Sequence, residues 1–421
     1  MFRSKKWAIL VALAVIVLSA CAPPAPEKVV ETVVVTKEVE KEKEVVKEVM
    51  VTPTPVPPAP LPDVIKIGVY EPMTGGMASG GQQTWEGTAL CNKRYKTEVL
   101  GKPIEVVLAD NKSDKTEAAM AMSYLIEDEK VVGVVGTYGS SLSIAAGEVA
   151  EAAGIPVVGC SPTNPMVTQG RKWYFRVCFI DPFQGYVMAK YAVDELGAKT
   201  ACVIQAVDEP YSVGLSKVFI ERFGEMTGDP KNVLSLSSGQ TGDTDFTAQL
   251  TYSIAKNPDV IFAPFHYREA GLLVKQAREL GYEGPLIGGD TWDAPEFIEI
   301  AGDACEGTAF STHFHPKGAI TDMSKEFIEI YKDEYGKEAN AFAALGWDAY
   351  MLLVDAIERA GSVEPEAIRH QLEITENLEL VTGMTTINYT HDAVKPAVIK
   401  QVQRLPDGTL GFVYLMSIAP E

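Results

Sequence analysis

Short apolar runs alternate with amphipathic segments along most of this chain, from Val64 onward. The runs have the length and composition of buried strands, and the longer segments between them have the periodicity of helices. The predicted strands are Ile65–Tyr70, Ile104–Ala109, Val131–Val135, Ile155–Gly159, Trp173–Phe179, Thr200–Gln205, Val233–Ser237, Val260–Ala263, Pro285–Ile287 and Thr308–Ser311. The predicted helices are Gln82–Lys96, Thr116–Glu129, Leu142–Ala153, Phe183–Leu196, Val213–Met226, Phe246–Lys256, Arg268–Leu280 and Pro295–Ala301. Such alternation specifies parallel α/β layers.

The number of strands predicts two similar α/β lobes, because so many alternations do not fit one small sheet. Asp181-Pro182 is the natural place for the division, since a proline restricts the residue before it. The carboxyl-terminal third instead predicts three successive helices, then three strands with a final hairpin at Pro406-Asp407-Gly408. Those helices need a sheet to cover, so we expect the chain to return to the first lobe and the crossings to form a hinge. The three helices are Met323–Tyr335, Phe342–Ala360 and Pro365–Ile374.

Two hydroxyl-rich loops follow neighbouring predicted strands. Ser140 and Ser141 come after Val131–Val135, and Ser161 and Thr163 come after the next strand. A right-handed crossover between parallel strands puts both loops at the same carboxyl edge of the sheet, where α/β folds bind ligands. Backbone N–H groups at helix N-termini add partial positive charge. The sequence therefore predicts a carboxylate site, although the hydroxyls would also serve as simple helix caps.

The amino terminus predicts export and a lipid anchor. Residues 1–21 combine a basic start with a short apolar run, the pattern of a signal peptide, and end in Leu18-Ser19-Ala20-Cys21, which resembles a bacterial lipobox with Cys21 as the lipidated residue. A plain signal peptide with an incidental cysteine is the alternative. Residues 22–62 are rich in Pro, Val, Glu and Lys and predict a stalk, either a solvated tether or, less favoured, a short coiled coil or strand.

Composition and charge exclude several classes. Hydrophobic residues make up 46% of the chain, enough for globular cores, and a net charge of -20 offers no basic face for nucleic acid. Dinucleotide and P-loop glycine motifs are absent, and no base accompanies a nucleophile near the two loops, so we expect no cofactor and no enzymatic activity. His313-x-His315 could supply two metal ligands but lacks a third, so a loop near a lobe crossing is the preferred interpretation.

Five cysteines follow Cys21, an odd number without a C-x-x-C pair. A zinc cage is therefore not expected, and at least one thiol stays unpaired unless it bonds to another chain. One disulfide among the five is compatible with this number, but the sequence does not identify which two cysteines would form it. The five are Cys91, Cys160, Cys178, Cys202 and Cys305.

The chain resembles the extracytoplasmic solute-binding proteins of bacterial ABC transporters, in particular the group that binds leucine, isoleucine and valine. The resemblance covers about residues 63–416, and together its motifs are highly specific. It implies two Rossmann-like lobes joined by three crossovers, the type I periplasmic binding protein fold. These motifs are IKIGVYEPMTGG, GTYGSS, GIPVVGCSPTNP, FRVCFIDPFQG, DEPYSVG, GDTDFTAQL, DVIFAPFHYREAG, KQARELGYEGPLIGGDTW and AGDACEG.

The resemblance also implies roles for single residues. Ser141 and Thr163 fall where the family grips the ligand α-carboxylate, and Asp290 falls where it places an acid for the α-ammonium. Tyr211 matches a second-lobe tyrosine that closes over the ligand. Either His266 or Tyr267 is expected to face it as well.

The pocket wall is a separate expectation from the resemblance. Gly80 falls where some leucine binders place a bulky side chain, so the pocket is either larger here or refilled by Tyr138, Trp85 or Trp292. The disulfide of some relatives has no matching cysteines.

The combined expectation is a non-enzymatic, lipid-anchored receptor on the outer face of a bacterial cell membrane. It would capture a small amino acid, branched-chain or similar, and deliver it to the permease and ATPase complex of an ABC importer. An amide, a urea-like compound or an aromatic acid is the alternative ligand, and sensing is the alternative role. The lobes would comprise residues 63–181 and 313–399 for the first and 182–312 and 400–421 for the second.

Overall fold

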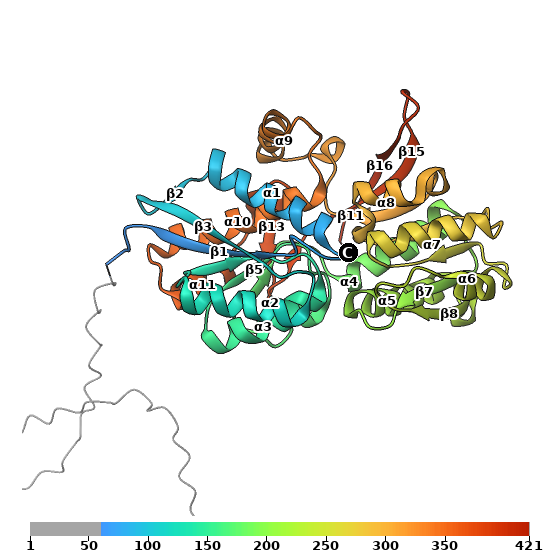
Figure 1. Cartoon of the computed structure of the whole chain (residues 1–421), viewed down its shortest axis with the longest axis horizontal. Coiled ribbons are helices and arrows are strands. Elements are labelled where there is room, and N and C mark those ends of the chain that lie inside the picture. The colour runs from blue at the N-terminus through green and yellow to red at the C-terminus, as the bar shows by residue number, and fades with distance from the viewer. Residues whose placement is uncertain (1–59, 421) are drawn as a thin grey trace, which may run out of the picture. The chain divides into compact units, whose positions relative to one another are not determined.

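The structure is a computed structural model that describes residues 60–420. The expected signal peptide, lipobox and nearly all of the expected stalk lie outside the described residues. Two sheets with helices on their faces form two lobes, seen side by side in Figure 1. The predicted α/β fold with two lobes is confirmed.

The first sheet has the order β2-β3-β1-β4-β5-β6, and all its pairs are parallel except β2 with β3. Each predicted strand of this sheet is present, and within it only the two-residue β2 was missed. Helices α1, α2 and α3 connect the strands. The bounds are β1 Ile65–Glu71, α1 Ala78–Arg94, β2 Glu98–Val99, β3 Lys102–Asp110, α2 Lys115–Ser123, β4 Gly133–Val135, α3 Ser140–Ala153, β5 Val157–Gly159 and β6 Tyr174–Arg176.

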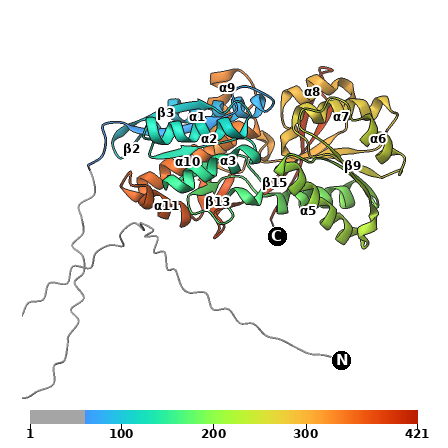
Figure 2. The same cartoon turned by 60° about the horizontal axis from the view of Figure 1, so that its bottom comes forward.

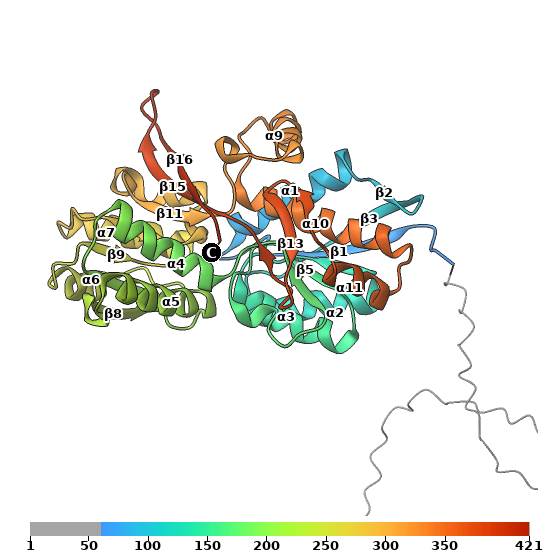
Figure 3. The same ribbon diagram turned by 180° about the vertical axis from the view of Figure 1, so that it is seen from behind.

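The second sheet has the order β16-β15-β11-β10-β9-β7-β8, with parallel pairs from β11 to β8 and the antiparallel hairpin β15–β16 at one edge. The hairpin projects from the second lobe in Figures 1 and 3. The bounds are α4 Asp181–Lys190, β7 Ala201–Ala206, α5 Pro210–Thr227, β8 Val233–Gly239, α6 Thr247–Ile254, β9 Val260–Phe262, α7 Tyr267–Glu279, β10 Leu286–Gly288, α8 Pro295–Ala301, β11 Ala309–Thr312, β15 Ala397–Arg404 and β16 Leu410–Ile418.

Three further helices return to the first lobe, as predicted. They are α9 (Asp322–Tyr335), α10 (Ala341–Ala360) and α11 (Pro365–Glu373). Helix α10 is buried along most of its length and packs against α1, β4 and β5. A small sheet follows, made of β12 Leu378–Leu380, β13 Gly383–Ile387 and β14 Ala393–Val394.

Helices α1 and α10 approach each other through glycines. A Cβ atom on Gly87 would lie 1.8 Å from the carbonyl oxygen of Ala343, and one on Gly346 would lie 2.0 Å from that of Thr84. Any side chain at either position would clash with backbone, so these glycines allow the contact between two helices that lie far apart in sequence.

The chain passes between the lobes three times. Residues 177–180 follow β6, residues 313–315 follow β11, and residues 395–396 precede β15. Strand β15 pairs with second-sheet strands from its first residue, Ala397, so the expected boundary at residue 399 falls inside a second-lobe strand. Helices α3 and α5, one from each lobe, face each other across the boundary (Figure 2).

Two predicted helices end earlier than expected. Helices α2 and α4 each stop and continue as one wider π-helical turn, Tyr124–Asp128 and Tyr191–Glu195. The spacing of apolar residues is compatible with an α-helical turn and with a π-helical turn, so the sequence does not show where the α-helix ends.

All five cysteines of the described chain are buried and unpaired. Between residues 60 and 420, no helix combines the length and apolar character needed to cross a membrane.

Candidate ligand-binding site

The two hydroxyl-rich loops are neighbours, as predicted, because β4 and β5 pair in parallel. The Ser140 hydroxyl accepts a hydrogen bond from the backbone N–H of Asn164 at 3.2 Å, which joins the loops. Helix α3 begins at Ser140, and no side chain caps it, so its first N–H groups point into the loop region with their partial positive charge. The second loop differs from expectation, since Asn164 caps only a single 3-10 turn, Pro165–Val167.

Ser161 and Thr163 have unused hydrogen-bonding capacity. Their hydroxyl oxygens are buried and have no hydrogen-bond partner. Ser141 is also buried, in the first turn of α3. Native proteins pair nearly all buried polar groups with protein, water or ligand. The arrangement therefore supports a ligand or water at this edge of the first sheet.

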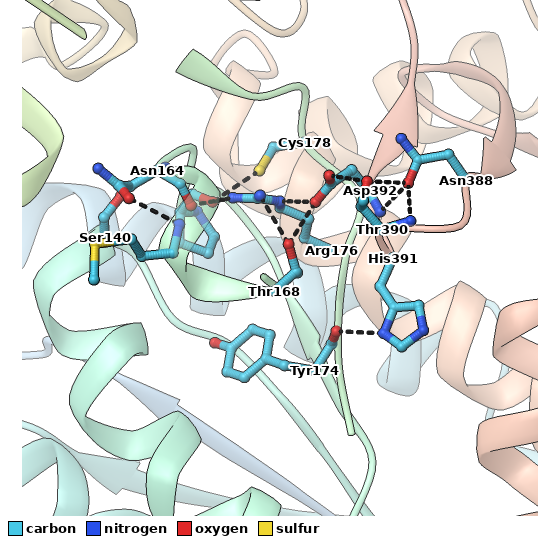
Figure 4. A network of polar contacts seen from close by, with 12 residues as sticks. Ser140, Asn164, Thr168, Tyr174, Arg176, Cys178, Asn388, Thr390, His391 and Asp392 are labelled. Carbon is cyan, nitrogen blue, oxygen red and sulfur yellow. Dashed lines mark hydrogen bonds and ion pairs between the residues drawn. The ribbon is translucent and has the colours of Figure 1, made fainter. Parts of the chain in front are cut away.

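Arg176 holds the second loop in place (Figure 4). Its guanidinium donates to the carbonyl oxygens of Pro162 at 2.6 Å and Asn164 at 2.7 Å, on either side of Thr163. It also donates to the Asp392 carboxylate at 2.6 Å, and the side chain is fully buried. Asp392 lies shortly before the third crossing. One cation thus fixes the backbone around Thr163 and ties it to the hinge region.

Glu71 holds the first loop. It lies at the end of β1, and its Oε2 accepts from the backbone N–H of Tyr138 at 2.8 Å and from the Thr137 hydroxyl at 3.2 Å. Burial raises the pKa of Glu71 to about 8 in spite of these donors. The buried Glu71 carboxyl group therefore holds the loop before Ser140 through two hydrogen bonds.

Asp290 follows β10 and forms the polar centre of the second-lobe side. Its Oδ1 accepts from Gln184 Nε2 at 2.8 Å and from the Tyr211 hydroxyl at 2.9 Å, and its Oδ2 lies 3.1 Å from His313 Nε2. Burial acts to raise the pKa of Asp290, but His313 and the other donors outweigh it and hold that pKa below its usual value. Burial lowers the pKa of His313, so a neutral imidazole donates to an ionised carboxylate.

Aromatic side chains surround this centre. The His266 ring lies between Tyr138 of the first lobe and Tyr211 of the second, with centroids 5.8 Å from each. His266 Nδ1 lies 3.4 Å from the Tyr138 hydroxyl, and its buried Nε2 has no partner. Tyr267 instead starts α7, and its hydroxyl accepts from the backbone N–H of Ser79 at 3.4 Å. His266 is therefore the one of the two that lies among the candidate site residues.

The space beside Gly80 is filled by Tyr138. A Cβ on Gly80 would lie 2.4 Å from the Tyr138 ring. Of the three aromatic residues considered for this space, Tyr138 is the one whose ring lies beside Gly80. Trp292 is buried in the second-lobe core, where its ring stacks on Phe297 at 4.8 Å, and Trp85 packs against the first-lobe core.

The lobes are in contact across their boundary. Ser79 Oγ donates to Glu296 Oε2 at 2.5 Å, and Asn164 Nδ2 donates to the carbonyl oxygen of Pro210 at 2.8 Å. A polar cavity of about 340 Å³ adjoins the Ser79 contact and is lined on its two sides by residues such as Gln83 and Lys400. The two lobes are thus joined by direct hydrogen bonds beside the candidate site.

Several polar residues of this region were missed by sequence reasoning. Asp181 and Gln184 lie in the first turn of α4, where the sequence suggested only a break between lobes. His313 was considered as a metal ligand, but it binds Asp290, while His315 Nδ1 accepts from the backbone of Lys317 at 3.0 Å. The spacing His-x-His therefore reflects two separate structural contacts.

A pair of α/β lobes that close on a buried polar site is the architecture of a solute-binding receptor. This chain belongs to the periplasmic binding protein family, whose model matches residues 64–409. Among curated relatives, an amino acid binding protein of Pseudomonas aeruginosa is 30% identical over 309 residues, which cover 72% of this chain and 81% of that protein.

Solved structures of two amino acid binding proteins are also similar to this chain. A leucine binding protein LivK from Thermotoga maritima is 44% identical, with a TM-score of 0.80 over 85% of this chain and 99% of that one. The branched-chain amino acid binding protein LivJ from Streptococcus pneumoniae, in complex with isoleucine, is 31% identical with a TM-score of 0.76, over 84% of this chain and all of that one.

Proposed function

We propose that this protein is a lipid-anchored receptor that captures a small amino acid, branched-chain or similar, and delivers it to the permease and ATPase of an ABC importer. The names of its relatives support this ligand class. The membership in a family of solute-binding receptors supports a role without catalysis.

The observation that carries the proposal is the opposite chemistry of the two lobes. The first lobe presents an uncapped helix N-terminus and buried hydroxyls without partners, which suit a carboxylate. The second lobe presents the ionised carboxylate of Asp290, which suits an ammonium group. A zwitterionic α-amino acid satisfies both, and an aromatic acid or an amide leaves Asp290 without a cation.

Isothermal titration calorimetry tests the ligand class. The protein should bind leucine, isoleucine or valine much more tightly than 4-methylpentanoate, which is leucine without its amino group, because the analogue cannot pair with Asp290. Equal affinity for leucine and 4-methylpentanoate would overturn the amino acid assignment.

Lipid anchoring rests on the sequence alone. We expect the chain to remain with membranes through high-salt washing and its Cys21→Ser variant to be released with ligand binding intact. Retention of that variant on the membrane would contradict a lipid anchor.

A further inference from the structure

We propose that Asp181 is a second acidic residue of the ligand site, where it accepts hydrogen bonds from a cationic amino group of the ligand together with Gln184. This inference rests on the proposed function and adds to it a residue that no resemblance assigns.

The first observation is the isolation of the Asp181 carboxyl group. The side chain is 1% exposed, and neither oxygen has a partner within normal hydrogen-bond geometry, although the Thr163 hydroxyl lies beside the carboxyl group. The other buried acids of residues 60–420 all accept at least one hydrogen bond. A buried polar group without a partner costs free energy, so a group that nothing pairs within the protein indicates a missing partner.

Three more acceptor or hydroxyl atoms without partners come from the same part of the molecule. They belong to Ser161, Thr163 and Gln184, all buried. The backbone N–H of Asp181 donates to the Thr163 carbonyl at 2.9 Å, and the Thr163 hydroxyl lies beside the Asp181 carboxyl group. Gln184 is one turn further along α4, on the same face of the helix. The hydroxyls can donate to the proposed ligand carboxylate, whereas Gln184 Oε1 and an ionised Asp181 only accept, so these two residues lack a group that carries hydrogen-bond donors.

Gln184 connects this cluster to Asp290. Its Nε2 donates to Asp290 Oδ1 at 2.8 Å, while its Oε1 remains without a partner. Asp290 already accepts from three protein donors, and a carboxylate has only about four acceptor sites. An ammonium group carries three N–H donors. Asp290 alone therefore has too few free acceptor sites for it, and Asp181 has the capacity that is missing.

The charges around Asp181 make its protonation depend on the ligand. Burial raises the pKa of Asp181 to about 8; the charges of Asp290 and Glu209 add to this shift, while the Thr163 hydroxyl and the Arg176 charge oppose it. At pH 7 the empty site thus holds a protonated Asp181 beside an ionised Asp290. A cationic amino group would favour the ionised form of Asp181, so its binding should release the Asp181 proton to the solvent.

The test is calorimetric titration of the full-length chain, in detergent, with L-leucine and 4-methylpentanoate at pH 7 in buffers of different ionisation enthalpy. The wild type should release a substantial fraction of a proton, up to about one, per leucine bound, because Asp181 is mostly protonated without the ligand. The variant Asp181→Asn should release almost none and bind leucine about 10- to 150-fold more weakly, with 4-methylpentanoate affinity changed less than about twofold.

Asp194→Asn, an exposed acid shortly after the same helix, is the matched control and should behave as the wild type does. If wild-type binding releases no proton and Asp181→Asn binds leucine with unchanged affinity, Asp181 holds water only and the inference is wrong. If the wild type binds none of leucine, isoleucine and valine, the proposed function itself fails, and the amine role of Asp181 fails with it. The proton count needs no variant, so it decides the inference even if Asp181→Asn does not fold.

Discussion

Asp290 collects donors from three separate parts of the chain, namely Gln184 on α4, Tyr211 on α5 and His313 after β11. Each of these segments lies at or beside a lobe crossing or at the carboxyl edge of the second sheet. The hydrogen bonds that stabilise the Asp290 carboxylate therefore come from elements close to where the two lobes join.

Replacement of this acid should be severe. We expect Asp290→Ala to weaken leucine binding by about 3–5 kcal/mol, or roughly 200- to 5,000-fold, because the buried ammonium loses its counter-charge. Calorimetry measures the affinity, and thermal unfolding checks that the variant is folded. A loss below fivefold would remove Asp290 as the ammonium partner.

Residue identities near the ends of strands were predictable, but their contacts were not. Ser140, Ser141, Ser161 and Thr163 could be placed at one edge of the sheet, because strand order and handedness fix where such loops lie. Asp181 could not, since its significance comes from having no partner after folding. Which of these residues touch the ligand stays a prediction.

Elements followed the hydrophobic pattern closely, because buried parallel strands need continuous apolar runs and helices need a periodic face. The structure differs from the prediction where the hydrophobic pattern does not distinguish between the alternatives. Strand β2 has two residues, and β15 begins two residues before the expected boundary. The second hydroxyl-rich loop leads into a 3-10 turn because Pro165 starts it and Asn164 caps it.

The segment from β5 to β6 depends on one buried ion pair. We expect Arg176→Met to lower the free energy of unfolding by about 3–5 kcal/mol, because it leaves the Asp392 carboxylate buried without its cation and two carbonyls without donors. Denaturant unfolding measures this change.

The double variant with Asp392→Asn should cost less than the sum of the two single changes, because the uncompensated charge is gone. Strict additivity would show that the pair is not coupled. Arg404, whose partners Asp303 and Glu306 are exposed, provides a contrast, and Arg404→Met should lower the free energy of unfolding far less than Arg176→Met.

At the scale of the whole molecule, the chain crosses between the lobes three times, and hydrogen bonds join the lobes on either side of the candidate site. Under the proposed function, the ligand carboxylate binds the first lobe and its ammonium group binds Asp290 of the second, so neither lobe alone holds the whole ligand. A zwitterion that contacts both lobes binds the closed state more tightly, and that difference shifts the population toward closure.

Small-angle scattering should therefore give a smaller radius of gyration with saturating leucine than without it. Asp290→Ala should show no decrease at the same leucine concentration. An unchanged radius in a wild-type sample that calorimetry shows to be saturated would mean that the lobes are closed before the ligand arrives.

The close crossing of α1 and α10 also determines when this protein can fold. Helix α1 lies near the start of the first lobe, but it packs on α10, which ends only at Ala360. The second sheet is complete only with β15 and β16, the last strands of the chain. A chain that emerges from its amino terminus therefore completes neither core until most of its length is available. Contacts between such distant segments slow folding. We therefore expect the two cores to form only after synthesis of most of the chain, which would suit a polypeptide that is exported before it folds.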